Sequence, residues 1–500
     1  MKTTVSVRHD VDEQRVECYR LFIVLVFLMS FNRPLVHRIA LLGLFFCFGF
    51  TEADADGDES PPNILIIYVD DLGYGDLGSF GHPVIETPHL DALAADGMTL
   101  TSYYAPSPLC SPSRAALLTG RHPYRTGIRS WIPHGSGVYL RDHEITLPEL
   151  LKDEGYATAL VGKWHLNSSL ASRAEPQPTE QGFDYFFGHN AFQIPTSRNP
   201  INIHRGHEPV GEQEGYIAEI YVDEAVRWLT AHDDDQPFLL MFNMAEPHTT
   251  FENPPEFNEK YREFINGEVV PIPSGGAKPP IELLIPRGPG EYYANVTYMD
   301  HQIGRLLSAM RELGLYDDTV IVFASDNGPV TENWRTWWEV NAHGSTGGLR
   351  GRKHRVYEGG IRVPAILRVP GITQAGSESD EVIIGTDLFT TLATLVDADI
   401  PTDRAIDGID ISDALAGDSL PPRSLMWALE DADGPDYAIR KGSWKLLLDD
   451  DQQPVALYNL DDDPLELLDV SDAHRDVVQV LSVQFQQQMM DIDKDPLRPR

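Results

Sequence analysis

The chain of 500 residues has few basic residues, few cysteines and no long apolar run. Its 39 basic residues face 76 acidic ones, which gives a formal net charge of -37. Such a surface repels nucleic acid and anionic membranes, so we expect neither as a partner. Any anionic substrate would need a local basic pocket, because the rest of the surface would repel it.

The N-terminal region carries two apolar runs, Leu21 to Phe31 and Ile39 to Phe50. Each is too short to cross a membrane, so we expect no stable membrane anchor. The second run has a basic lead-in and is followed by Ala53-Asp54-Ala55, which is typical of a secretory signal. We therefore predict a signal peptide over residues 1–55, with Met29 as an alternative start, and a secreted or periplasmic protein.

Cysteine usage singles out one position. The three cysteines are Cys18, Cys47 and Cys110, and cleavage after Ala55 would leave Cys110 alone. An intrachain disulfide is then excluded, although an oxidising compartment would permit one. A single cysteine in an exported chain suggests a reactive or modified side chain, whereas most free cysteines are small core residues.

Apolar runs alternate with helical patterns along the chain and predict the fold class. This alternation is typical of an α/β protein with a mostly parallel sheet flanked by helices. A hairpin at 437–448 and a helix at 477–490 then predict a smaller antiparallel domain. We place the catalytic domain at 62–415 and a C-terminal α+β subdomain at 416–500. The predicted strands are Asn63 to Val69, Tyr156 to Val161, Phe238 to Met244 and Thr319 to Ser325, and the predicted helices are Thr87 to Gly97, Thr146 to Gly155, Tyr216 to His232, Tyr292 to Leu313 and Thr386 to Ala398.

The stretch Leu109 to Arg121 reads as a turn running into a short helix. Ser111 can cap this helix, Pro112 suits its first position, and Gly120 is a natural stop. Cys110 would then lie at a helix N-terminus, which favours an anion, with Arg114 adding positive charge close by.

The letters CSPSRAALLTGR resemble the signature of type I sulfatases, and the resemblance extends over most of the chain from Asn63. The run from Asp70 to Gly78 is similar to the arylsulfatase A and N-acetylgalactosamine-6-sulfatase branch of that family. The resemblance implies an alkaline-phosphatase-like fold and hydrolysis of sulfate monoesters, with release of inorganic sulfate. It also implies that a formylglycine-generating enzyme oxidises Cys110 to formylglycine, an aldehyde.

Oxygen ligands follow two of the predicted strands. Asp70 and Asp71 end one strand, while Asp326 and Asn327 end another. Ligand sites in parallel sheets lie beyond the carboxyl ends of the strands, and hard oxygen donors suit Ca²⁺ or Mg²⁺. Taken alone, either pair would be a solvated turn. The resemblance implies calcium at Asp70, Asp71, Asp326 and Asn327, with an oxygen of the modified Cys110 as a further ligand.

Three further elements carry candidate catalytic residues. Lys163 and His165 lie in G-K-W-H, and a continuing strand would place them on one face with Trp164 on the other. His248 follows a buried strand in E-P-H, where Thr249-Thr250 replaces the proline usual in the family. Lys353 precedes Y-E-G-G-I-R-V-P in a loop crowded with Arg350, Arg352 and Arg355, and Arg362 would brace that loop. Taken singly, these would more often be a surface lysine with a capping histidine, a structural histidine and a solvated basic turn.

The resemblance also implies roles for these residues. Arg114, Lys163, Lys353 and the metal would neutralise the sulfate, and one hydroxyl of the hydrated aldehyde would attack it. Asp326 would accept the proton of that hydroxyl, His248 would protonate the leaving alcohol, and His165 would deprotonate the second hydroxyl. The predicted substrate is a sulfated carbohydrate or a small sulfate ester. Its choice would depend on loops near 187–207, 251–287 and 329–348, and the Pro- and Gly-rich stretch 271–289 is expected to be a long loop at the rim.

Two other functions stay open on the sequence. Relatives in the same superfamily that hydrolyse phosphonates or phosphodiesters can share the aldehyde and the metal site. A catalytically inactive protein could also keep the fold for carbohydrate recognition. The extended motif and the intact set of site residues favour a sulfatase.

Overall fold

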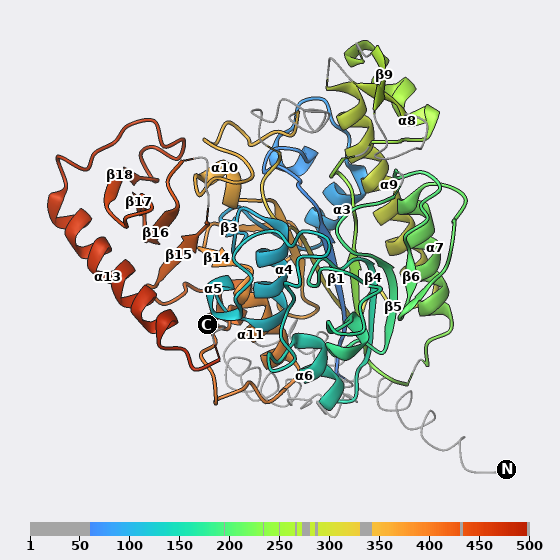
Figure 1. Cartoon of the computed structure of the whole chain (residues 1–500), viewed down its shortest axis with the longest axis horizontal. Helices are drawn as coiled ribbons and strands as arrows, with labels where there is room; N and C mark the ends of the chain where they lie inside the picture. Colours follow the sequence, from blue (N-terminus) through green and yellow to red (C-terminus); the bar gives the residue numbers. More distant parts are fainter. Residues whose placement is uncertain are drawn as a thin grey trace, which may run out of the picture. The chain divides into compact units, whose positions relative to one another are not determined.

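A sheet of ten strands forms the centre of the protein in the computed structural model (Figure 1). The structure describes residues 61–497 apart from 195, 234, 250, 266–267, 273–280, 286–288, 331–342 and 431–433. The predicted signal peptide, with Met29, therefore lies outside the described residues. No helix in the described part of the chain is long and apolar enough to span a membrane.

The five middle strands of the sheet run parallel, as the alternating pattern predicts. Their carboxyl ends therefore meet at one edge, where polar residues follow each strand. The strands lie in the order β13 (Ser377–Ser379), β2 (Met98–Leu100), β12 (Ala365–Arg368), β11 (Thr319–Ser325), β1 (Asn63–Val69), β8 (Phe238–Asn243), β4 (Ala157–Lys163), β5 (Tyr185–His189), β6 (His204–Arg205) and β7 (Glu208–Pro209).

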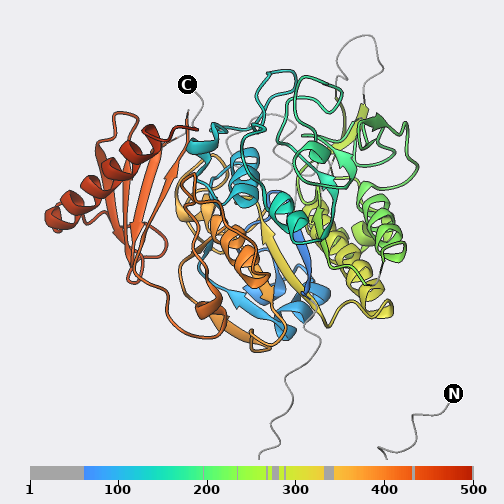
Figure 2. The same cartoon turned by 90° about the horizontal axis from the view of Figure 1, so that it is seen from below.

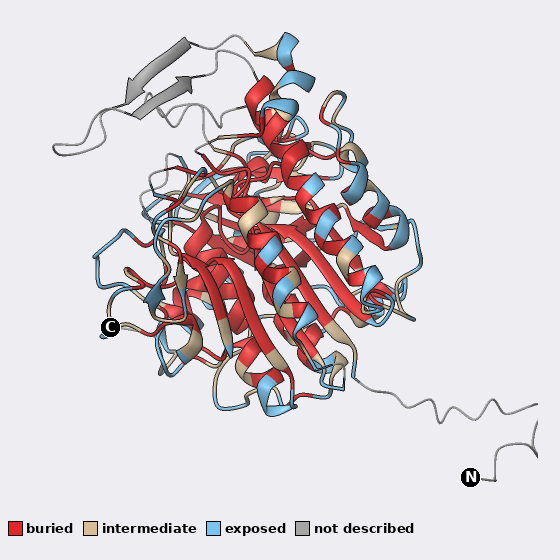
Figure 3. Ribbon diagram, turned by 90° about the vertical axis from the view of Figure 1, so that its right-hand side faces the viewer, coloured by how far each residue is buried: buried red, intermediate tan, exposed pale blue. Residues whose placement is uncertain are grey.

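Helices cover both faces of the sheet, and the middle strands are buried along almost their whole length (Figures 2 and 3). On β1, Ile64, Ile66 and Tyr68 face one helix layer, while the residues between them face the other. The first layer holds α4 (Cys110–Thr119), α6 (Leu147–Asp153) and α11 (Thr386–Leu395), and the second holds α3 (Pro88–Asp96), α7 (Ile217–Thr230) and α9 (Gly290–Glu312). Burial on both faces explains why these strands are near-continuous apolar runs.

A separate antiparallel sheet follows in the chain and confirms the predicted C-terminal hairpin. One face of this sheet packs on the long last helix, and the other packs on Tyr104, Leu109, Val356, Tyr357 and Ile361. Its elements are β15 (Ser424–Ala428), β16 (Tyr437–Lys441), β17 (Trp444–Leu448), β18 (Pro454–Asn459) and α13 (Arg475–Asp493). The boundary at 415/416 stays a prediction.

The remaining elements are short, and one of them corrects the sequence analysis. The stretch 271–289 was expected to be a loop, but β9 (Glu268–Ile272) and β10 (Ile281–Ile285) pair as an antiparallel hairpin there. The backbone N–H and C=O groups of the two strands bond to each other across this antiparallel pair. The other short elements are β3 (Tyr103–Tyr104), β14 (Ile383–Ile384), α5 (Pro123–Thr126), α8 (Pro255–Lys260), α10 (Glu358–Ile361) and α12 (Ser412–Leu415).

Candidate active site

Helix α4 begins at Cys110, so the predicted position of this cysteine at a helix N-terminus is confirmed. The predicted cap is wrong, because the cap position is Leu109 and the Ser111 hydroxyl accepts a hydrogen bond from the Ile132 backbone N–H at 3.1 Å. Ser111 thus ties a distant loop to the helix instead of capping it. Gly120 ends the helix in the left-handed region, at φ 66°, as predicted.

The Cys110 side chain faces His165. The sulfur lies 3.2 Å from His165 Nδ1, and His165 Nε2 lies 3.1 Å from the Ile132 carbonyl oxygen. A carbonyl only accepts, so Nε2 carries the hydrogen and Nδ1 presents its lone pair to residue 110. Burial and the Lys163 charge hold the pKa of His165 well below its usual value, and burial raises the pKa of the Cys110 thiol. The pair therefore rests as a neutral thiol beside a neutral base.

Lys163 and His165 both reach the site, but not by the predicted route. Strand β4 ends at Lys163, and His165 has a positive φ of 57°, so the strand does not continue through Trp164. Trp164 instead packs into the core against Phe183. The reversal of the backbone at His165, rather than strand alternation, turns its ring toward Cys110.

The acidic residues gather where β1 and β11 end. Val69 pairs with Ser325 in parallel register, which places Asp70 and Asp326 side by side. Asp70, Asp71 and Asp326 each offer a carboxylate oxygen, and these oxygens lie within 4.8 Å of one another. Asn327 Nδ2 donates to Asp71 Oδ1 at 2.6 Å, which brings the fourth predicted ligand to the cluster.

Three buried cations face these three carboxylates. Arg114 donates to Asp326 Oδ2 from Nε at 3.0 Å and Nη2 at 2.7 Å. Lys163 Nζ lies 2.5 Å from Asp70, and Lys353 Nζ lies 2.5 Å from Asp71. Burial would raise the pKa of Asp70, but Lys163 and the neighbouring cations hold it well below its usual value. Burial and the Asp70 charge raise the pKa of Asp326 to about 7.

The cluster has the donor set that a hard cation requires. Three buried oxygens of the cluster accept no hydrogen bond from the described part of the chain. They are Asp70 Oδ1, Asp71 Oδ2 and Asn327 Oδ1. An unsatisfied buried acceptor costs about 1–3 kcal/mol, so such a group calls for a partner. A divalent cation bound by carboxylate and amide oxygens would satisfy all three. The residues therefore fit Ca²⁺ or Mg²⁺.

His248 lies next to this cluster at the wall of a pocket. Its Nδ1 donates to the Thr249 carbonyl at 2.8 Å, and its Nε2 lies 3.5 Å from Asp71 Oδ2. Burial lowers the pKa of His248, while Asp71 opposes that shift. Nε2 is consequently the atom that gains or loses a proton, close to both the carboxylate and the pocket.

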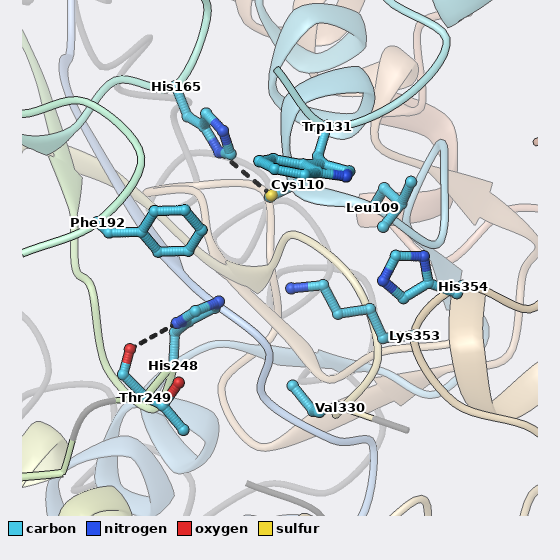
Figure 4. A pocket seen from close by; sticks show the side chains of 10 residues that line it. All are labelled: Leu109, Cys110, Trp131, His165, Phe192, His248, Thr249, Val330, Lys353 and His354. Carbon is cyan, nitrogen blue, oxygen red and sulfur yellow. Dashed lines mark hydrogen bonds between the residues drawn. The ribbon is translucent and has the colours of Figure 1, made fainter. Parts of the chain in front are cut away.

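The pocket opens above Cys110 and, with the open space at its mouth included, encloses about 730 Å³. Figure 4 shows the Cys110 sulfur, the imidazoles of His165 and His248 and the Lys353 ammonium around one space, with the Trp131 and Phe192 rings beside them. The lining residues are Leu109, Cys110, Trp131, His165, Phe192, His248, Thr249, Val330, Lys353 and His354.

Sequence reasoning missed part of this lining. Phe192 and Val330 lie in two of the loops expected to select the substrate, but Trp131 lies in none of them. Its only sequence signal is a large aromatic residue in a loop rich in proline and glycine.

The expected basic patch disperses in the structure. Arg350 turns to the C-terminal sheet, where it donates to the Tyr458 hydroxyl at 3.0 Å. Arg352 donates to the Gly344 carbonyl at 2.8 Å. Of the lysine and arginine residues in this loop, Lys353 is the one that lines the pocket. Arg362 donates to the Thr101 carbonyl from Nε at 2.8 Å and thereby braces the loop, as expected.

A family model described as Sulfatase matches residues 62–398, well over half of the chain. The chain belongs to the sulfatase family. The enzyme is thus a sulfuric ester hydrolase, and the resemblance to sulfatases seen in the CSPSRAALLTGR motif is confirmed. A second model, described as N-sulphoglucosamine sulphohydrolase, C-terminal, matches residues 351–495 of this sulfatase.

Relatives and solved structures agree with this assignment. The sulfatase is 34% identical over 398 residues to N-acetylgalactosamine-6-sulfatase of Canis lupus familiaris, covering 75% of this chain and 69% of the relative. It is also 34% identical to arylsulfatase A of Homo sapiens, over 77% of this chain and 74% of that relative. A crystal structure of Ps i-CgsB in complex with k-i-k-neocarrahexaose superposes with a TM-score of 0.73 at 27% identity. The match covers 86% of this chain and 93% of that structure's chain. The alkaline-phosphatase-like fold expected from the sequence is therefore confirmed.

Proposed function

We propose that this protein hydrolyses sulfate monoesters on carbohydrates, at a chain end, and releases inorganic sulfate. One observation carries the proposal. Three buried carboxylates, two of which have an oxygen that no hydrogen bond of the described residues reaches, lie beside three buried cations and next to a cysteine at a helix N-terminus. Such preorganised charge suits an ester that is itself anionic, because catalysis must stabilise charge that shifts during cleavage.

The chain's own residues would hold two groups that the family uses. A divalent cation, calcium or magnesium, would be held by Asp70, Asp71, Asp326 and Asn327 and would supply positive charge at the sulfate. A formylglycine made from Cys110 by a formylglycine-generating enzyme would supply the attacking hydroxyl and a ligand oxygen. Arg114, Lys163 and Lys353 would bind the sulfate oxygens, and Asp326 would take up the proton of the attacking hydroxyl.

The two histidines would move the remaining protons. His165 presents a lone pair at Nδ1 toward residue 110, which suits it to deprotonate a second hydroxyl there. His248 Nε2 lies on the pocket side of the cluster beside Asp71, which stabilises its protonated form. We therefore assign His248 to protonation of the departing alcohol.

The substrate class is supported by the relatives and by charge. N-acetylgalactosamine-6-sulfatase is among the relatives, and the Ps i-CgsB structure is a complex with a carrahexaose. The net charge of -37 would repel a long polyanion, whereas a small pocket whose cations are buried can accept one terminal sulfated sugar.

The test is a substrate panel assayed with the purified enzyme. We expect turnover of terminally sulfated mono- and oligosaccharides, with synthetic aryl sulfates as weaker surrogate substrates. Phosphate and phosphonate esters serve as the controls. Faster turnover of these phosphorus esters would establish the alternative activity, and rapid internal cutting of long polymers would contradict action at the chain end.

We also propose that the protein is exported, either secreted or to the periplasm. The apolar run before Ala53-Asp54-Ala55 supports cleavage after Ala55, so the mature chain should begin near Asp56. N-terminal sequencing of the protein from the medium or the periplasmic fraction checks this. Exported protein that still carries residues 21–50 would contradict it.

A further inference from the structure

The pocket wall above the reactive residues is largely apolar. Apart from Cys110, His165, His248 and Lys353, the polar lining residues are Thr249 and His354, and the others are Leu109, Trp131, Phe192 and Val330. A sulfate group would be bound by the buried cations, so the rest of the substrate must meet this apolar wall. Such a wall suits the C–H face of a ring better than a strongly hydrated group.

Trp131 has unusual exposure for a tryptophan. It is 36% exposed, although most large aromatic residues of the described chain are buried. Its ring lies edge-to-face with Phe192, at 6.4 Å between centroids, and Phe192 in turn lies 5.6 Å from the His248 ring and 6.3 Å from the His165 ring. Figure 4 shows Trp131 next to Cys110, with its ring beside the space that the histidines and Lys353 surround.

The loop that carries Trp131 is fixed to the catalytic groups themselves. The next residue, Ile132, is 1% exposed, and its N–H donates to Ser111 Oγ on helix α4. Its carbonyl accepts from His165 Nε2 at 3.1 Å. The indole is therefore held at a fixed place relative to both residue 110 and its base, as a positioned contact surface requires.

We infer that Trp131 determines substrate specificity by stacking on the pyranose ring that carries the sulfate. The inference rests on the proposed function and specifies how the sugar part is held at that site. A rigid aromatic face offers area to the C–H face of a sugar at low entropic cost. The cations below would then fix the sulfate, while Trp131 fixes the plane of the ring.

Kinetics of the Trp131→Ala and Trp131→Phe variants test this inference. For the best sulfated sugar of the panel, Trp131→Ala should raise KM about tenfold or more, in line with losses seen when a stacking ring is removed. Trp131→Phe should keep most of the affinity. The inhibition constant of inorganic sulfate should stay unchanged in both variants, because sulfate alone has no ring to stack.

The control variant is Trp228→Ala, which removes another partly exposed tryptophan, one that stacks on His232 outside the pocket. It should leave both constants unchanged. An unchanged KM in Trp131→Ala would overturn the inference, and so would an equal weakening of inorganic sulfate inhibition, which would place Trp131 in the sulfate site. Wild-type enzyme that turned over no sulfated saccharide would instead overturn the proposed function, and the inference with it.

Discussion

Replacing Cys110 with serine is expected to lower kcat for sulfate esters by at least about a thousandfold, the scale of loss seen when a catalytic nucleophile is replaced. A serine offers one hydroxyl, which can attack sulfur in its place. It has no second hydroxyl on the same carbon, so it cannot expel sulfate as a hydrated aldehyde can. His165 would then have no proton to remove at residue 110 in the step that restores the enzyme.

Intact mass distinguishes this explanation from simple loss of the site. The Cys110→Ser variant should gain the mass of one sulfo group (SO3) on its serine oxygen after incubation with substrate, while the alcohol departs with the serine proton, and then stop. The Cys110→Ala variant is the matched control, because it has no nucleophile and should neither gain mass nor turn over. Both variants should keep the fold, since residue 110 lies at the start of α4 and its sulfur, in the described part of the chain, has His165 as its only hydrogen-bond partner.

Wild-type protein supplies the opposing test. Fully active enzyme in which peptide spectra find only a free thiol at Cys110 would contradict the formylglycine mechanism. Burial raises the pKa of the Cys110 thiol, so the unmodified cysteine would be a poor nucleophile at neutral pH. This supports a mechanism that uses formylglycine rather than the thiol.

The part of the site at strand ends could be predicted from the sequence. Asp70 and Asp326 follow apolar runs, and parallel strands end at one edge, so their meeting follows from topology. The start of α4 near Cys110 was predictable for a different reason, because the signals that start and stop a helix are local in sequence. His165 was placed correctly for the wrong reason, because its positive φ depends on contacts with Ile132 and Cys110 that lie far away in sequence.

The pocket rim could not be predicted in this way. Trp131 reaches the pocket because Ile132 binds Ser111 and His165, and neither contact leaves a periodic signal. Arg350 shows the converse, since it lies beside Lys353 in sequence but binds Tyr458 in the C-terminal sheet. Loop side chains are directed by such long-range partners, whereas buried strands and helices are directed by their own apolar pattern.

Removing Asp326 is expected to abolish metal binding and, with it, activity. Asp326 is fully buried, and its loss leaves Asp70 and Asp71 as the only carboxylates of the cluster in the described chain. With one charged ligand gone, the affinity of Asp326→Ala for calcium should fall by at least about a hundredfold. Elemental analysis of the purified variant should find no bound calcium or magnesium, whereas the wild type should hold one ion per chain.

Stability must be separated from metal binding in this test, because Asp326 also pairs with Arg114. Removing one partner of a buried ion pair costs about 3–5 kcal/mol of stability, whether or not the metal is bound.

Asp387→Ala is the matched control. Asp387 lies in helix α11, outside the cluster, is equally buried and accepts a hydrogen bond from Arg423 Nη1 at 2.6 Å. This control should lower Tm but keep the ion. A chelator should lower the Tm of the wild type and of Asp387→Ala, because removing a bound ion destabilises the folded state. It should leave the Tm of Asp326→Ala unchanged, because that variant holds no ion. An Asp326→Ala enzyme that kept both its ion and its turnover would show that the metal is held elsewhere.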